Sequence, residues 1–166
     1  MRDPRLGVED IEDLRGTGLA AADLAELYEL ATECTVAYHS RTGWPFGVRM
    51  SYLRHDGRFW LTAVSGREHV ESLRADPRLT LVVDNSGTGL PGRRMVAVRA
   101  RTTLHADRDV KDWFYPAFAA RLGVADPAAF VRLLDSPGRV VLEAVPTGRQ
   151  VSHDSRRIGG DGRGGS

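Results

Sequence analysis

The residues best suited to chemistry in this chain lie in one short segment, FWLTAVSGREHV, at positions 59–70. A strand is predicted to end at Thr62, a loop follows with Ser65, Gly66 and Arg67, and a helix begins there. Hydroxyl groups, a guanidinium and the amide groups of a helix N-terminus favour a bound phosphate, and Gly66 lets the backbone approach it closely. The segment therefore predicts a phosphate-binding site.

A second pair of polar residues, Arg49 and Ser51, lies two positions apart on the preceding predicted strand. Residues at this spacing share one face of a sheet, so both can reach the same point from the neighbouring strand. A purely structural interpretation stays open: Ser65 only caps the helix, Arg67 pairs with a neighbouring glutamate, and Arg49 is a solvated strand residue.

Other site chemistries find little support in the sequence. Cys34 is the only cysteine, which excludes an intramolecular disulfide and a cysteine-based zinc site. The five histidines lack the spacing of a helical metal-binding pair, so we expect no metal site. Neither Cys34 nor His105 has an obvious triad partner, and no catalytic side chain is assigned.

The elements that would position the phosphate site are mostly short strands. Hydrophobic periodicity predicts strands over residues 34–39, 46–53, 58–63, 79–84, 94–106 and 139–145, and helices over residues 19–32, 65–75, 107–122 and 127–134. So many short antiparallel strands expose their edges unless the sheet closes on itself. We therefore expect a mainly β fold with helices (α+β), a six-stranded closed or nearly closed antiparallel barrel. A doubly wound α/β fold is disfavoured, since no G-x-G-x-x-G joins a strand to a helix.

The length of 166 residues fits a single domain. We expect an N-terminal arm over residues 1–18, the barrel domain over 19–146 and a Gly- and Arg-rich tail with little order over 147–166. The chain starts without the apolar run of a signal peptide, and no stretch approaches the roughly 18 apolar residues of a membrane span. The expected location is therefore the cytoplasm, with no membrane contact.

The charge balance bears on possible partners. Lysine and arginine together number 23 against 22 acidic residues, and Lys111 is the only lysine. A nucleic-acid-binding protein usually carries a positive surplus or a basic face, so nucleic acid is not an expected partner. The abundance of arginine is typical of a GC-rich genome.

Several segments follow one another in a familiar order: a helix, CTVAYH, FGVRMSYLRHDGRFWLTA, the Ser-Gly-Arg loop with its helix, ADPRLTLVVD, and a long strand beginning at Arg94. In this order they resemble the pyridoxamine 5'-phosphate oxidase-like, FMN-binding split β-barrel superfamily. The resemblance covers residues 20–106, and its most specific pieces are RMSYLR at 49–54 and SLRADPRLTLVV at 72–83. The superfamily includes oxidoreductases that depend on flavin or on the deazaflavin coenzyme F420.

The resemblance implies cofactor contacts from four places in the chain: Arg49, Met50 and Ser51; Leu61 and Thr62; Ser65, Gly66 and Arg67; and Arg94, reaching the cofactor of the other subunit. The family usually has a lysine in the first helical turn after the loop. This chain offers Glu68, which would repel a phosphate, or His69, which could donate a hydrogen bond. Arg54 stands where the oxidase itself usually has a lysine.

The function implied by the resemblance is hydride transfer between FMN or F420 and a small organic substrate, in a homodimer with the cofactor between subunits. Vitamin B6 oxidation is not expected, because the oxidase's C-terminal run of tryptophan and arginine is missing. Alternatives are a non-catalytic flavin- or haem-binding module and an interaction domain on an emptied barrel. An aromatic cluster (Trp113, Phe114, Tyr115 and Phe118, with Trp44) could form a substrate wall or plain core, and Tyr52, Tyr115 or water could supply a proton.

Overall fold

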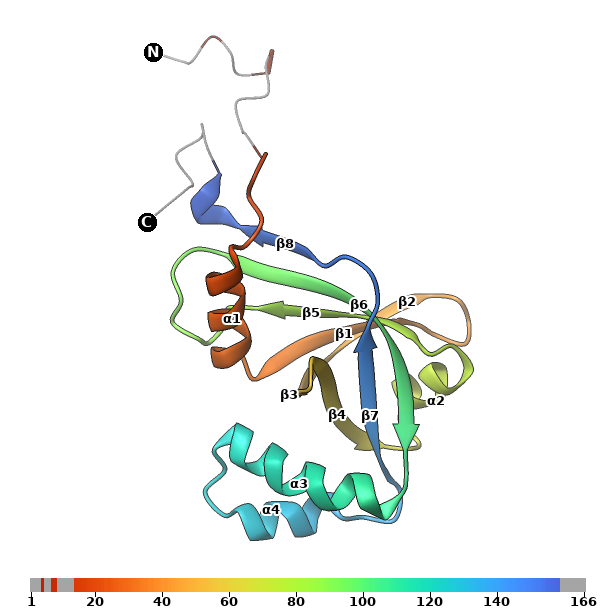
Figure 1. The fold of residues 1–166 in the computed structure, drawn as a ribbon. Helices are drawn as coiled ribbons and strands as arrows, with labels where there is room; N and C mark the ends of the chain where they lie inside the picture. Colours follow the sequence, from red (N-terminus) through yellow and green to blue (C-terminus); the bar gives the residue numbers. More distant parts are fainter. Residues whose placement is uncertain (1–3, 5–6, 9–13, 159–166) are drawn as a thin grey trace. The chain divides into compact units, whose positions relative to one another are not determined.

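The computed structural model describes residue 4, residues 7–8 and residues 14–158 (Figure 1). The chain divides into two compact units. The first comprises Met1–Ala31, Val83–Ala97 and Val151–Ser166, and the second comprises Thr32–Val82 and Val98–Gln150. The strands β5 and β6 continue from one unit into the other. The second unit contains every predicted site residue except Arg94.

The described elements confirm the expected α+β class. The strands are β1 (Glu33–His39), β2 (Pro45–Ser51), β3 (Leu53–His55), β4 (Arg58–Val64), β5 (Arg78–Asp84), β6 (Arg94–His105), β7 (Arg139–Pro146) and β8 (Val151–Asp154). The helices are α1 (Ala21–Leu30), α2 (Glu68–Ala75), α3 (Arg108–Leu122) and α4 (Pro127–Leu134), followed after β8 by the short helix η1 (Ser155–Arg157). The described residues thus form eight strands, not the expected six. The difference is β3, which separates from β2, and β8.

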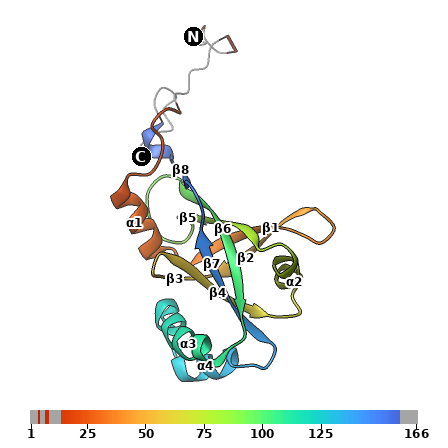
Figure 2. The same ribbon diagram turned by 45° about the vertical axis from the view of Figure 1, so that its right-hand side comes forward.

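The strand order explains how the sheet curls. It runs β2-β1-β5-β6-β7-β4-β3, with antiparallel pairs such as β1–β2 and β4–β7. Its two edge strands, β2 and β3, are separated along the chain by Tyr52 alone. A sheet whose opposite edges are one residue apart has to curl back toward itself, and the ribbon follows this curl in two views (Figures 1 and 2). Tyr52 is fully buried at this junction, and its amide donates to the carbonyl of Thr32 at 3.0 Å.

Alternating burial builds the core of the second unit. Successive residues of β1 and β5 alternate between buried and half-buried, as expected when one sheet face is covered. Asp56 and Gly57 form the turn before β4, and both have a positive φ, as an Asp-Gly hairpin turn requires.

The hairpin of α3 and α4 adds a second apolar cluster. It comprises Trp60, Phe114, Tyr115, Phe118, Leu134 and Val141. Both helices have a side-chain cap: Asp107 accepts from the amide of Val110, and Asp126 accepts from the amide of Ala129, with Pro127 in the first turn. Firm caps fix where these helices begin and so where their apolar faces lie.

The first unit corrects the expectation of a tail with little order. Residues 151–157 form β8 and η1, and β8 pairs with the start of β6. Asp154 is fully buried, accepts from Arg156, and Arg156 also bonds Asp23 of α1 at 2.8 Å. These ion pairs order a segment that is rich in Ser and Arg. Of the predicted arm, residues 1–3, 5–6 and 9–13 lie outside the described residues, and so do residues 159–166 of the tail.

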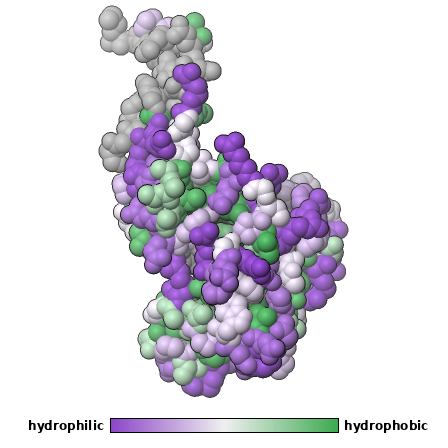
Figure 3. Space-filling model, in the orientation of Figure 1, coloured by the Kyte–Doolittle hydropathy of each residue, from purple (hydrophilic) through white to green (hydrophobic). Residues whose placement is uncertain are grey.

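The surface shown in Figure 3 is mostly hydrophilic, and apolar residues reach it only in small patches. Within the described part of the chain, no helix combines the length and the apolar character that crossing a bilayer requires.

Candidate cofactor-binding site

A cavity of about 1050 Å³ in the second unit brings together most of the predicted site residues. Its walls come from the β1–β2 hairpin, the end of β4, the loop and first turn of α2, the α3–α4 hairpin and the start of β7. Six of the predicted residues line it: Arg49, Met50, Ser51, Thr62, Arg67 and His69. The cavity is large enough for a cofactor the size of a flavin nucleotide.

Three arginines and a histidine line this cavity. Arg49 extends from β2, Arg67 precedes α2, His69 lies in the first turn of α2, and Arg139 begins β7. Arg49 is half exposed and pairs with Glu33 at 3.1 Å. Arg67 forms no ion pair with any residue that the structure describes, which leaves its charge available to an anion.

Two donors in the lining are buried and lack a protein partner. They are Nε2 of His69 and Nε of Arg139, neither of which bonds to a described residue. A buried polar atom without a hydrogen bond destabilises a protein by about 1–3 kcal/mol, and a ligand that forms the missing bond removes this cost. Burial lowers the pKa of His69 below its usual 6.5, and the charge of Arg67 lowers it further, so the ring is neutral near pH 7. Both atoms are open to a hydrogen-bond acceptor on a bound ligand.

Glu68 is the only carboxylate among the described lining residues, and two neighbours hold it. The hydroxyl of Tyr38 donates to one oxygen, and the hydroxyl of Ser72 donates to the other at 2.9 Å. The bond from Tyr38 lowers the pKa of Glu68, while burial and the bond to Glu68 raise the pKa of Tyr38 to about 12. The carboxylate is thus ionised but engaged, which leaves His69 as the first-turn residue free to meet a phosphate.

The loop before α2 differs from the expectation. Arg67, not Ser65, is the N-cap residue, and no side chain caps the helix. Ser65 bonds through its amide to the carbonyl of Gly138 at 2.7 Å, and neither Ser65 nor Gly66 lines the cavity. The structural alternative of Ser65 as a cap is therefore wrong, and the phosphate loop is represented in the cavity by Arg67 alone.

Three further predicted positions lie away from the cavity. Leu61 is fully buried in β4, and Arg54 of β3 stacks over the ring of Phe59 at 5.8 Å. Arg94 is buried in the first unit, where it bonds Glu26 at 2.7 Å and approaches Asp23 at 3.6 Å. This ion pair gives Arg94 a structural role within its own chain, and its contact with the cofactor of another subunit stays a prediction.

The other part of the cavity is apolar. Phe118 and Leu122 of α3 and Phe130 and Leu134 of α4 line it. Of the aromatic residues that we considered for a substrate wall, only Phe118 lines the cavity. Trp113, Phe114 and Tyr115 belong to the apolar cluster around α3 without reaching the lining, and Trp44 is 70% exposed. The hydroxyls of Tyr52 and Tyr115 are not in the lining either, so neither is placed to donate a proton there.

Sequence reasoning missed Arg139, Tyr38 and, apart from Phe118, the helical wall. Arg139 could have been found from strand pairing, because β7 runs antiparallel to β4 and sets Arg139 opposite Val64, beside the predicted phosphate loop. No comparable sequence pattern points to Tyr38, because its position in β1 is typical of an aromatic residue in the core. The described residues contain no group of three or more His, Cys, Asp or Glu side chains that could hold a metal ion.

A family model described as pyridoxamine 5'-phosphate oxidase matches residues 21–151. No curated protein sequence is significantly similar to the chain.

Solved structures share the fold at low sequence identity. A conserved hypothetical protein from Mycobacterium tuberculosis has a TM-score of 0.71 at 20% identity, covering 86% of this chain and 89% of that one. An F420 reductase has a TM-score of 0.57 at 20% identity, with 74% and 92% covered. The haem storage protein HutZ from Vibrio cholerae has a TM-score of 0.65 at 12% identity, with 81% and 94% covered.

Proposed function

Because this chain belongs to the pyridoxamine 5'-phosphate oxidase family, we propose that its cavity binds a flavin or deazaflavin cofactor, FMN or F420, for hydride transfer to a small organic substrate. One observation carries the proposal: the unpartnered Nε2 of His69 and Nε of Arg139 are buried in the lining of one cavity that also receives Arg49 and Arg67. Such a set of donors is suited to a phosphate monoester.

The lining residues would make different kinds of contact with the cofactor. Arg49, Arg67 and Arg139 supply charge and His69 a hydrogen bond to the phosphate, while Ser51 and Thr62 offer hydroxyls beyond them. Thr62 already donates to the carbonyl of Val140 at 2.8 Å, so its oxygen is held in one orientation and can accept a bond from the ligand.

The helical wall completes the site. Phe118, Leu122, Phe130 and Leu134 give a ring system an apolar surface and keep water from that part of the cavity. When bound, the cofactor supplies hydride transfer, and the protein contributes binding, orientation and electrostatics. No side chain is assigned as an acid or base. The substrate proton then comes from water.

Titration of the purified protein tests the proposal. FMN and F420 are added separately, and quenching of cofactor fluorescence is followed, with Arg132→Gln on the exposed face of α4 as a control for the loss of one arginine. We expect one cofactor to bind, Arg49→Ala to weaken it by about 1.5–3 kcal/mol, and the control to bind as the parent does. If neither cofactor quenches, the proposal fails. Reduction of quinones, enones or nitroaromatics by the loaded protein then tests turnover.

The alternative is a haem-binding module without catalysis, which His69 favours. Its unpartnered Nε2 lines the cavity, and imidazole nitrogen is a common axial ligand of haem iron. Hemin titration distinguishes the two proposals: a Soret shift that His69→Gln abolishes supports haem, and a shift that survives the substitution excludes His69 as its ligand.

The cofactor is further proposed to lie between two copies of the chain in an isologous homodimer, the assembly that the family resemblance implies. Sedimentation equilibrium with and without cofactor tests this. A monomer at micromolar concentration in both conditions would contradict it.

A further inference from the structure

The second unit has another cavity, of about 590 Å³, outside the site just described. It lies on the sheet at β1, β5 and β6, which are neighbours in the strand order. The outward residues Ala37, Thr80, Arg99 and Arg101 line it, and they alternate along their strands with buried residues such as Val36, Leu81 and Val98. The cavity therefore opens on the sheet face opposite the core.

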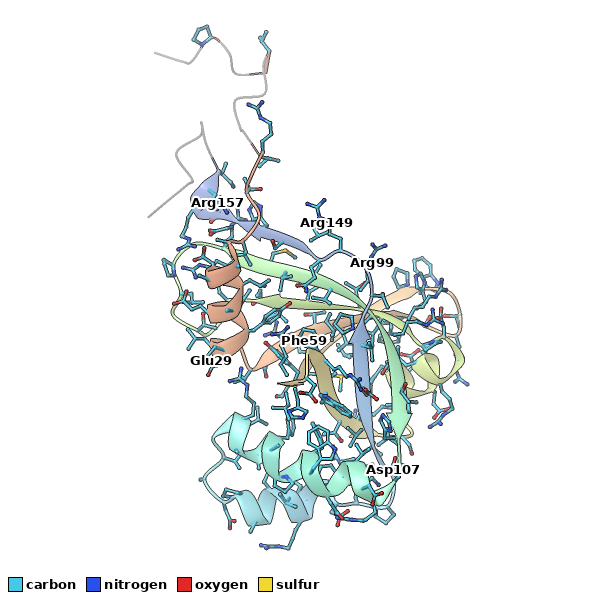
Figure 4. The ribbon with its side chains drawn as sticks, viewed as in Figure 1. Glu29, Phe59, Arg99, Asp107, Arg149 and Arg157 are labelled. Carbon is cyan, nitrogen blue, oxygen red and sulfur yellow. The ribbon has the colours of Figure 1, made fainter. Side chains whose placement is uncertain are left out.

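Two guanidinium groups in this cavity lack counter-charges. Arg99 and Arg101 are exposed, lie two residues apart on β6, and form no ion pair with a residue of the described ranges. At strand geometry their Cα atoms are about 7 Å apart, which lets both side chains converge on one small anion. Figure 4 shows Arg99 extending away from β6.

The third arginine of the lining differs from these two. The guanidinium of Arg78 bonds both oxygens of Asp76, at 2.7 to 3.1 Å, and these bonds lower the pKa of Asp76 to about 2. Arg78 is thus already neutralised. Among the described lining residues there is no carboxylate, so the cavity keeps the two positive charges of Arg99 and Arg101.

The rest of the lining is preformed and partly apolar. Thr147, after β7, donates from its amide to the carbonyl of Arg99 at 2.7 Å. The next residue, Gly148, has a φ of +69°, and a Cβ there would lie 3.5 Å from Nη2 of Arg99. The turn after β7 is therefore held beside this guanidinium. Pro45, which pairs with His39 across the β1–β2 hairpin, adds apolar surface.

We propose that this cavity is a second ligand site, which takes a small organic anion. The phosphate or carboxylate group lies between Arg99 and Arg101, and the apolar body of the ligand lies against Ala37 and Pro45. Two unpaired positive charges favour a dianionic phosphate monoester over a monocarboxylate of the same shape. This site is separate from the proposed cofactor cavity and does not depend on its function.

Three probes with the same ring test the proposal: phenyl phosphate, benzoate and uncharged benzyl alcohol. Each is titrated into the ¹⁵N-labelled protein while the Nε–Hε signals of the arginines, assigned by single Arg→Gln variants, are followed by NMR. We expect phenyl phosphate to shift the signals of Arg99 and Arg101, benzoate to do so more weakly, and benzyl alcohol to leave them unchanged.

Variants separate this site from the first one. Arg99→Gln with Arg101→Gln should weaken phenyl phosphate binding at this cavity about tenfold or more, as loss of charged hydrogen bonds predicts, and Arg132→Gln should not. FMN titration of the double variant should match that of the parent protein. Because both arginines are exposed, the double variant should fold, which circular dichroism verifies.

Two results would overturn the proposal. One is the absence of any shift at Arg99 and Arg101 up to millimolar phenyl phosphate. The other is a set of shifts confined to Arg49, Arg67 and Arg139, which would place the probe in the cofactor cavity. Either result leaves the FMN titration free to succeed or fail separately.

Discussion

Substitution of Arg139 by glutamine should weaken cofactor binding while leaving the stability of the cofactor-free protein nearly unchanged. The Nε of Arg139 is buried without a hydrogen bond to a described residue, so the free protein gains nothing from this donor. A cofactor phosphate that accepts from it forms a charged hydrogen bond, which contributes about 1.5–3 kcal/mol. The two states therefore respond differently to the same change.

The magnitude follows from these contributions. Arg139→Gln should weaken FMN or F420 binding about 10- to 150-fold, since each 1.4 kcal/mol is a factor of ten. The free energy of unfolding of the cofactor-free protein should change by less than about 1 kcal/mol, because removal of an unsatisfied buried donor offsets the lost packing of the side-chain stem.

The assay measures both quantities on one preparation. Urea denaturation gives the free energy of unfolding, fluorescence titration gives the dissociation constant, and Arg132→Gln serves as the matched control. A variant that binds as the parent does, yet unfolds 2 kcal/mol more easily, would refute the reasoning and make Arg139 a structural residue.

The further predictions concern three titratable groups. His69→Gln should remove the pH dependence of phosphate binding. Because protonation of His69 strengthens this binding as the pH falls below 7, the ratio of the parent's affinity to the variant's should rise toward pH 5. A ratio that does not change with pH would exclude contact between His69 and the phosphate. Over the same pH range the free energy of unfolding of the cofactor-free parent should fall relative to that of the variant. The pKa of His69 is lowered in the folded state, so the unfolded state binds more protons below pH 6.5. Urea denaturation at several pH values measures this difference. Glu68→Gln should strengthen phosphate binding several-fold in the same titration, because it removes the only carboxylate of the described lining. Weaker binding would contradict this and would show that the hydrogen bond between Tyr38 and Glu68 is essential to the site. Cys34 should resist alkylation at pH 8 in the folded protein, since burial raises the pKa of its thiol to about 12, and mass spectrometry showing rapid labelling without denaturant would contradict its burial.

Local patterns predicted the elements well because each depends on nearby residues. The alternation in β6 and the Asp-Pro start of α4 are readable within a few positions, and the structure has both. The break at Tyr52 was not readable in this way. The run of residues 46–53 alternates without interruption, and only the return of the sheet edge, where Tyr52 bonds Thr32, divides it into β2 and β3.

Long-range ion pairs account for the two largest differences from expectation. Arg156 joins Asp23, and Arg94 joins Glu26, at sequence separations of 133 and 68 residues. The first orders a segment whose composition predicts little order. The second engages an arginine that the resemblance assigned to a cofactor. Neither partner could be chosen from a sequence in which arginines and acidic residues are equally spread.

The part of the candidate site on β2 and on the loop before α2 was predicted from the sequence. The part on β7 was missed, because only the folded sheet places β7 beside them. Arg49 and Arg67 come from adjacent stretches of the first half of the chain, whereas Arg139 arrives through the β4–β7 pairing. The family pattern also expects a lysine in the first turn of α2, a position where this chain has Glu68 and His69. Arg139 supplies a cation to the same cavity from β7, so the loss of positive charge in the helix need not imply the loss of phosphate binding. If Arg139 takes over the role of that lysine, Arg139→Gln combined with Glu68→Lys should regain most of the affinity that Arg139→Gln loses, and a double variant as weak as Arg139→Gln alone would show that the two positions do not serve one phosphate.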